Sequence, residues 1–187
     1  MNEAQHHTDD FTTVFDTHKK RVYNTVLSLL QNREETEDVV QEVFIKVYET
    51  LPQFKGESSL STWIYRIAVN KSLDALKTKK TKKRSGFLVS LFGDKKDESK
   101  PLDVPDFVHP GVIAENKELA TTLFKAINQL PDNQKVAFTL CKMDGLNYAE
   151  IAEVMQVSIP SVESLLFRAK QNLQKKLRTF YENEVLM

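Results

Sequence analysis

Apolar residues recur every three or four positions along most of the chain, which is the spacing of one face of an α-helix. No stretch alternates apolar and polar residues over a useful strand length. The sequence therefore predicts an all-α fold. The expected helices lie at 11–30, 35–51, from 62 onward, 112–130, 133–143, 148–155 and from 159 onward.

Polar residues stand where several of these helices should begin. Asn147 followed by Glu150 forms a variant of the capping box, in which the two side chains bond each other's backbone N–H groups. Ser158 precedes Pro160, a residue that is tolerated in a first helical turn. Ser61 is expected to cap the helix that follows it. The last two helices are therefore joined by a tight turn.

A short helix, a tight turn and a longer helix with a polar first turn form the layout of a DNA-reading helix-turn-helix. The same layout also occurs in helical bundles that bind no ligand, so the pattern alone leaves both interpretations open. Basic residues further along the second helix favour DNA, because they could contact phosphates. These residues are Arg168, Lys170, Lys175, Lys176 and Arg178.

Glycine and proline residues interrupt the helical pattern between residues 85 and 111. We interpret this segment as a flexible linker between a domain at 8–84 and a domain at 112–183. The fold is thus expected to contain two small helical domains, of which the C-terminal one carries the helix-turn-helix. An apolar island at 87–92 lies inside the predicted linker, and the sequence assigns no role to it.

The formal net charge is zero, but the charges are sorted along the chain. Carboxylates dominate residues 34–50, whereas an unopposed basic run follows at 77–84. Such sorting suggests two different partners. The single cysteine, Cys141, excludes a disulfide framework and a cysteine-based metal site. The N-terminus is polar and no apolar run approaches the ~20 residues of a membrane span, so we expect a soluble, cytoplasmic protein.

A candidate site for unpaired bases lies at 54–60, which we predict to be a loop, and at the helix that follows it. Aromatic, hydroxyl and cationic groups gather there, and these groups can stack on and hold unpaired bases. Trp63 taken alone is more often a core anchor. An enzyme is the least favoured class, because the four histidines are scattered and no glycine loop could hold a phosphate. We expect no cofactor and no metal.

Together these segments resemble the extracytoplasmic-function (ECF) group of bacterial RNA polymerase sigma factors, over nearly the whole chain. Residues 38–48 are similar to the group's polymerase-binding helix, and 54–80, with Thr62-Trp63-Ile64, to its segment for promoter melting and −10 reading. Residues from 130 onward, with Tyr148-Ala149-Glu150-Ile151-Ala152, are similar to its −35-reading domain.

The resemblance implies a role for individual residues. Contact with the clamp helices of the largest subunit of core polymerase is implied for Asp38, Gln41, Glu42 and Lys46. Contact with the −10 element is implied for Phe54, Lys55, Ser58, Ser59, Trp63, Asn70, Asp74, Lys77, Lys79 and Lys80. Contact with the −35 element is implied for Tyr148, Ser158, Pro160, Ser161, Glu163, Ser164 and Arg168.

The implied partners are core RNA polymerase, promoter DNA and an inhibitory anti-sigma factor, with no small-molecule substrate and no membrane insertion. The chain departs from the group's pattern at Gln156, where relatives often carry glycine, and at Leu165, where many carry arginine. Two other classes stay open. One is a stand-alone helix-turn-helix regulator that binds palindromic sites as a dimer. The other is a protein-interaction module in which the helix-turn-helix only packs.

Overall fold

The computed structural model describes residues 3–92 and 117–184. These residues form α1 (Glu3–Leu30), α2 (Arg33–Thr50), the 3-10 helix η1 (Leu51–Gln53), α3 (Leu60–Phe92), α4 (Lys117–Asn128), α5 (Asp132–Lys142), α6 (Tyr148–Met155) and α7 (Ile159–Glu184). The described residues contain no strand, so the predicted all-α fold is confirmed. The part of the predicted linker from 93 to 111 lies outside the described residues.

Helices α1, α2 and α3 pack around a core of small and branched side chains. Val26, Val43, Val47 and Ala68 are completely buried in it. A tight turn joins α1 to α2, where the side chain of Asn32 accepts a hydrogen bond of 2.9 Å from the backbone N–H of the third residue of α2. This cap fixes the start of α2 and lets the two helices run back along each other.

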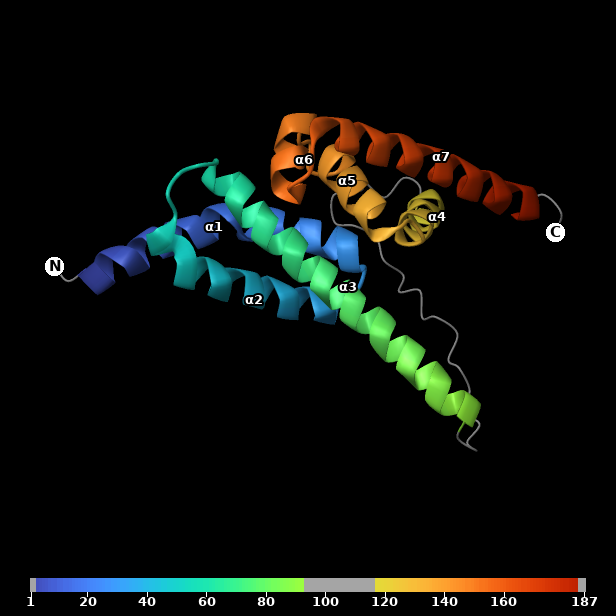
Figure 1. Ribbon diagram of the computed structural model, residues 1–187, viewed down its shortest axis with the longest axis horizontal. Helices are drawn as coiled ribbons and strands as arrows, with labels where there is room; N and C mark the ends of the chain where they lie inside the picture. The colour runs from blue at the N-terminus through green and yellow to red at the C-terminus, as the bar shows by residue number, and fades with distance from the viewer. Residues whose placement is uncertain (1–2, 93–116, 185–187) are drawn as a thin grey trace.

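Helices α4 to α7 form the second group. Phe124 and Ile127 of α4, and Leu130 just after it, pack on Ala169 and Leu173 of α7. The short α6 and the beginning of α7 form the predicted helix-turn-helix, with α5 behind them. The long α7 continues well beyond this unit towards the C-terminus (Figure 1).

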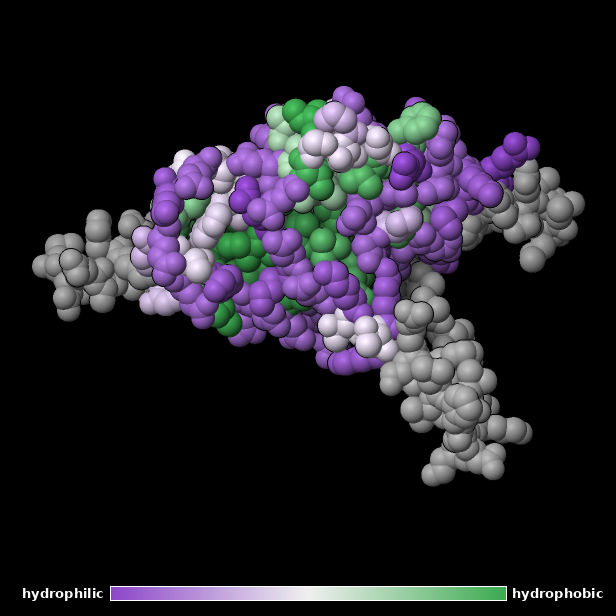
Figure 2. Space-filling model, in the orientation of Figure 1, coloured by the Kyte–Doolittle hydropathy of each residue, from purple (hydrophilic) through white to green (hydrophobic). Residues whose placement is uncertain are grey.

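A third apolar cluster joins the two groups of helices. Leu29 of α1 and Tyr65 and Val69 of α3 are buried against α5, α6 and α7, where they meet side chains such as Leu140 and Ile151. Figure 1 shows α5 and α6 lying over α1 and α3. In Figure 2 apolar residues come to the surface in the middle of the visible face, between α3 and the helices above it. The two groups therefore share a core.

Polar contacts surround this shared cluster. Some are hydrogen bonds to backbone carbonyls, and others join ionisable side chains. They are Gln31 Nε2 to the Phe124 carbonyl (2.9 Å), Lys135 Nζ to the Leu29 carbonyl (3.4 Å), the Thr25 hydroxyl to Asp144 (2.9 Å), Lys80 to Asp132 (2.6 Å) and Arg66 to Glu153 (3.8 Å).

The contact between the two groups of helices buries two ionisable side chains, Asp144 and Lys135. Burial raises the pKa of Asp144 to about 6, against the opposing effects of the Thr25 hydroxyl and of Arg21. Burial lowers the pKa of Lys135 to about 8, although the charge of Asp132 opposes this shift. Both groups are thus mainly ionised in the folded chain between about pH 6 and pH 8, where burying them costs the most free energy.

Two predictions about α3 were wrong. Its helix does not end near residue 84 but continues to Phe92, because no proline intervenes and a single glycine costs a helix only about 1 kcal/mol. The island at 87–92 therefore lies in the last turns of α3, where only the backbone is described. The second wrong prediction concerns the start of α3, which is capped by Ser59 and not by Ser61. The Ser59 hydroxyl accepts from the backbone N–H of Thr62 at 3.0 Å.

The predicted start signals of the helix-turn-helix are confirmed. Asn147 and Glu150 make both bonds of the capping box, at 3.0 and 2.8 Å. Ser158 accepts from the backbone N–H of Ser161 at 3.3 Å at the start of α7. Gln156 ends α6 in the left-handed region, with φ 55° and ψ 45°. The turn therefore keeps the conformation that glycine adopts without strain, although a glutamine occupies it.

Replacing Asp144 by asparagine should stabilise the chain at neutral pH. The folded-state pKa of Asp144 lies above its ordinary value, so its contribution to stability is complete below about pH 4 and is lost as the pH rises through about 6. Asp144→Asn should raise the free energy of unfolding by about 1–2 kcal/mol at pH 7.5 and hardly change it near pH 4.5. Urea titrations at the two pH values test this. An equal change in unfolding free energy at both pH values would contradict the burial of the Asp144 charge.

Replacing Gln156 by glycine should also stabilise the chain, because glycine adopts positive φ without the clash of a Cβ. We expect Gln156→Gly to raise the unfolding free energy by about 1 kcal/mol, measured by thermal or urea unfolding. Gln156→Val is the matched variant and should destabilise the turn, since a β-branched residue tolerates this conformation worst. A loss of stability in the glycine variant would contradict the left-handed turn.

Candidate nucleic-acid and partner interfaces

The outer face of α2 carries the residues that the sequence assigned to polymerase binding. Asp38, Gln41, Glu42 and Lys46 are all exposed, while the opposite face of α2 is buried in the core. Helical spacing separates the two faces, because positions 38, 41, 42 and 46 fall between the buried valines. The structure thus brings all four side chains to one accessible stripe.

This face also carries apolar residues that the sequence analysis did not single out. Ile45 is 52% exposed and Tyr48 44% exposed, and both line a hollow of about 510 Å³ between α1 and α2. Phe11 and Phe15 of α1 form part of its wall, with Phe11 packed edge-on against Tyr48 at 5.1 Å. The sequence held a signal for this surface, because Ile45 and Tyr48 are apolar but fall outside the buried helical stripe of α2. Large exposed apolar groups beside charged ones are typical of a protein-binding surface.

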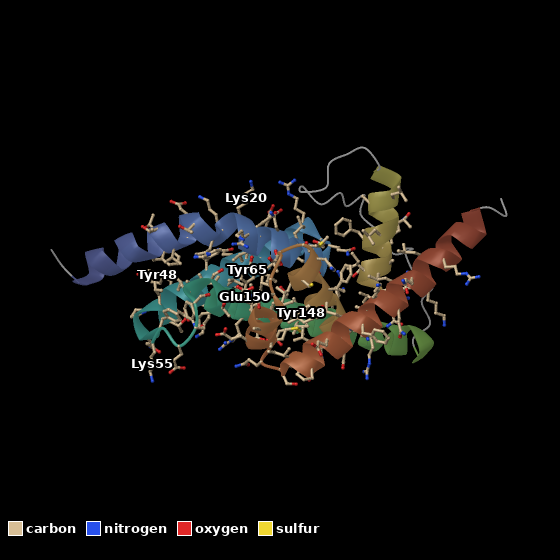
Figure 3. The ribbon with its side chains drawn as sticks, turned by 90° about the horizontal axis from the view of Figure 1, so that it is seen from above. Lys20, Tyr48, Lys55, Tyr65, Tyr148 and Glu150 are labelled. Carbon is tan, nitrogen blue, oxygen red and sulfur yellow. The ribbon has the colours of Figure 1, made fainter. Side chains whose placement is uncertain are left out.

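The loop before α3 and the first turn of α3 hold the aromatic part of the predicted −10 site. Phe54 and Trp63 are half-buried, and their rings lie 5.1 Å apart at 39° to each other. Gly56 has a φ of 71°, which lets the chain turn between them. Lys55 projects from this loop (Figure 3). The tilted pair of rings and an exposed cation therefore occupy one end of α3.

The two serines of this loop have different positions. Ser58 is half-buried, and its hydroxyl lies 3.4 Å from the carbonyl of Ser59. Ser59 is exposed, but its hydroxyl is engaged with Thr62 as the helix cap. The predicted role of Ser59 at the −10 element therefore competes with its role in starting α3.

Residues assigned to two different partners lie in one groove. Asn70 and Asp74 of α3 face Glu42 and Lys46 of α2 across a hollow of about 550 Å³. Lys71 crosses this groove to bond Glu42 at 2.8 Å. The sequence analysis treated the polymerase and −10 surfaces as separate. In the structure they are adjacent, because α2 and α3 pack side by side.

The basic residues of the predicted −10 site point in different directions. Lys77 is exposed and bonds Asp74 on the same helix at 3.2 Å, whereas Lys79 bonds Glu35 of α2 at 2.7 Å. Lys80 bonds Asp132 of α5. Along the helix axis Trp63 lies about 21–26 Å from these lysines, at about 1.5 Å per residue. The predicted −10 residues thus form an aromatic part and a basic part, and two lysines of the basic part are paired with carboxylates of other helices.

The predicted −35 residues lie at the beginning of α7 and just before it, except Tyr148, which begins α6. All of them are exposed: Tyr148, Ser158, Pro160, Ser161, Glu163, Ser164 and Arg168. Val162 and Ala169 on the opposite side of α7 are fully buried. Leu165 is half-buried against the shared core, so it acts as a packing residue. Phe167, which the sequence analysis omitted, is 63% exposed on the same helix.

The described residues include no group of histidine, cysteine, aspartate or glutamate that could hold a metal ion. None of the described helices combines the length and apolar character needed to cross a membrane.

Family models match both groups of helices. The model for sigma-70 region 2 matches residues 14–82, and the model for sigma-70 region 4 matches residues 121–173. Among curated proteins, the chain is 32% identical to the ECF RNA polymerase sigma-E factor of Haemophilus influenzae, over 85% of this chain and 89% of that protein. It is 34% identical to the sigma-E factor of Escherichia coli, over 75% of this chain and 73% of that protein.

Solved structures share the fold. The sigma factor RpoE from Bartonella quintana, in complex with the anti-sigma factor NepR, matches with a TM-score of 0.67 over 90% of this chain and 97% of that chain, at 20% identity. CnrH, in complex with the cytosolic domain of CnrY, matches with a TM-score of 0.63 over 92% of this chain and 90% of that chain, at 19% identity. With both region models in the expected order and relatives above 30% identity, the chain belongs to the ECF group of RNA polymerase sigma factors.

Proposed function

We propose a division of labour within this sigma factor, which directs RNA polymerase to its promoters. Residues 8–84 bind core polymerase and read and melt the −10 element, and 112–183 read the −35 element. The connection at 85–111 begins with the last turns of α3. The observation that carries this assignment is the exposed polar edge of α7, held by a capped turn and backed by buried Val162 and Ala169. As a transcription initiation factor, the chain acts on cytoplasmic polymerase and catalyses no reaction of its own.

At the −35 element, the beginning of α7 enters the major groove. Ser161, Glu163 and Ser164 supply donors and acceptors for base edges, and Arg168 adds a charge one turn further along. Phe167 adds an apolar surface next to them, suited to the methyl group of a thymine. Burial of the opposite side of α7 supports this orientation, because only one side of the helix is available to DNA.

At the −10 element, the loop at 54–60 captures an unstacked base of the opened strand. Phe54 and Trp63 provide aromatic faces, and base stacking on such faces contributes about 1–3 kcal/mol per base. Capture of this size offsets the few kcal/mol needed to extrude a base. Asn70, Asp74 and Lys77 lie further along α3, where they contact neighbouring bases or phosphates.

Core polymerase binds the outer face of α2. The charged stripe sets the orientation of the complex, and Ile45 and Tyr48 beside it supply apolar area for burial. An anti-sigma factor is a further partner, since the similar fold of RpoE from Bartonella quintana was solved with the anti-sigma factor NepR bound. An inhibitor on the same surfaces would block polymerase directly.

Replacing Asp38 and Gln41 together by alanine should weaken core binding by about tenfold, because both side chains leave the proposed interface while the pair between Glu42 and Lys71 stays intact. Glu34→Ala is the matched control, an exposed acidic residue near the start of the same helix. Titration of labelled core polymerase measures the affinity. Equal affinities for the double variant and the control would remove α2 as the polymerase-binding face.

Replacing Lys77 by alanine should impair promoter opening and leave core binding unchanged, since Lys77 lies on α3 outside the groove that Asn70 and Asp74 share with the polymerase stripe of α2. Adding Asn70→Ala should deepen the defect in opening. Permanganate reactivity of thymines at −10 should fall about tenfold, whereas the control Lys20→Ala, on α1, should react like the wild type. Lys20 projects from α1 away from the loop that carries Lys55 (Figure 3). Unchanged reactivity in the double variant would contradict the −10 assignment.

A further inference from the structure

A set of exposed side chains near the start of α7 makes no side-chain hydrogen bond, ion pair or ring contact with any other described residue. They are Glu163, Ser164, Phe167 and Arg168. The serines of the first turn differ from them, because the hydroxyls of Ser158 and Ser161 lie 2.8 Å apart and help to hold the start of the helix. If α7 reads the −35 element as proposed above, the choice of base falls mainly on the four uncommitted side chains.

Glu163 differs from the other three because an ionised carboxylate accepts hydrogen bonds and donates none. When the carboxylate enters the major groove it loses water, and this loss costs free energy unless a donor on a base replaces the water. Guanine and thymine present only acceptors there, at O6, N7 and O4, so both repel a carboxylate. The Ser164 hydroxyl both donates and accepts, and it therefore discriminates little.

The two remaining bases each carry an amino group in the major groove, N4 of cytosine and N6 of adenine. Adenine also presents the acceptor N7 beside its amino group, where it faces the second oxygen of the carboxylate. Cytosine presents no acceptor in this groove. Glu163 is therefore matched best to cytosine.

Phe167 lies four residues after Glu163, hence on the same side of the helix and about 6 Å further along its axis. Its ring is 63% exposed, and an apolar side chain in the major groove is suited to the methyl group of thymine. Successive bases of one strand are about 3.4 Å apart, so the two side chains reach bases about two positions apart.

We propose that Glu163 is a specificity-determining residue that selects a cytosine in the −35 element, by accepting a hydrogen bond from the N4 amino group. Phe167 selects a thymine within about two base pairs of this cytosine. The carboxylate acts by attraction to one base and by repulsion of guanine and thymine, which is a common basis of specificity.

A promoter library with a randomised −35 element tests this assignment. Core polymerase with the full chain transcribes the library, and barcoded transcripts report which promoters are used. One position should prefer cytosine over guanine by about tenfold. Glu163→Gln should move the preference at this position to adenine, and Glu163→Arg should move it to guanine, because these side chains pair with those bases. Glu34→Gln, an exposed carboxylate on α2, is the matched control and should change no position.

Phe167→Ala should reduce the preference for thymine severalfold at a neighbouring position and leave the cytosine position unchanged. Unchanged selection at the remaining positions shows that each variant still folds and binds the promoter. This readout separates base selection from a structural role of either residue, because a damaged α7 weakens selection at every position.

Three results would overturn the inference: no position responds to the Glu163 variants, the responding position selects a base other than cytosine in the wild type, or Glu163→Gln weakens selection evenly at all positions. In each case the proposed function stands, because the wild type still selects its −35 element. A wild-type holoenzyme that selects no base at any −35 position would instead refute the proposed reading of this element by α7.

Discussion

Burial of Leu29, Tyr65 and Val69 against the helix-turn-helix is the interaction on which the rest of the structure depends. These residues complete the apolar centre around Ile151 and Val162. Without them, one side of α5 and α6 would face water. Their packing also buries Asp144 and Lys135, so the contact carries the free-energy cost of desolvating two ionisable groups. The contact therefore has an apolar centre and ion pairs at its edge, Lys80 with Asp132 and Arg66 with Glu153.

The same contact sets what each surface can do. The outer stripe of α2 and the leading edge of α7 stay accessible, so the proposed polymerase and −35 surfaces are both open to partners. Lys80 is held by Asp132 and Lys79 by Glu35, so the basic part of the −10 surface is only partly available.

The sequence predicted the elements well, because helical periodicity and capping residues are local signals. The starts of both helices of the helix-turn-helix were predicted from their capping residues, Asn147 and Glu150 for α6 and Ser158 for α7. Ser59 was missed as the cap of α3 because Ser61 lies only two residues away and the two are chemically equivalent. The shared core could not be predicted, since Leu29 and Val69 belong to ordinary helical stripes that do not reveal their partners. The exposure of Ile45 and Phe167 likewise depends on tertiary packing.

The most direct measurement is run-off transcription from genomic fragments of the source bacterium, comparing core polymerase alone with core polymerase plus this chain. We expect new start sites that depend on the chain and share one sequence near −35 and one near −10. Absence of such start sites, together with specific retention of DNA by the chain without polymerase, would contradict the assignment and indicate a stand-alone regulator.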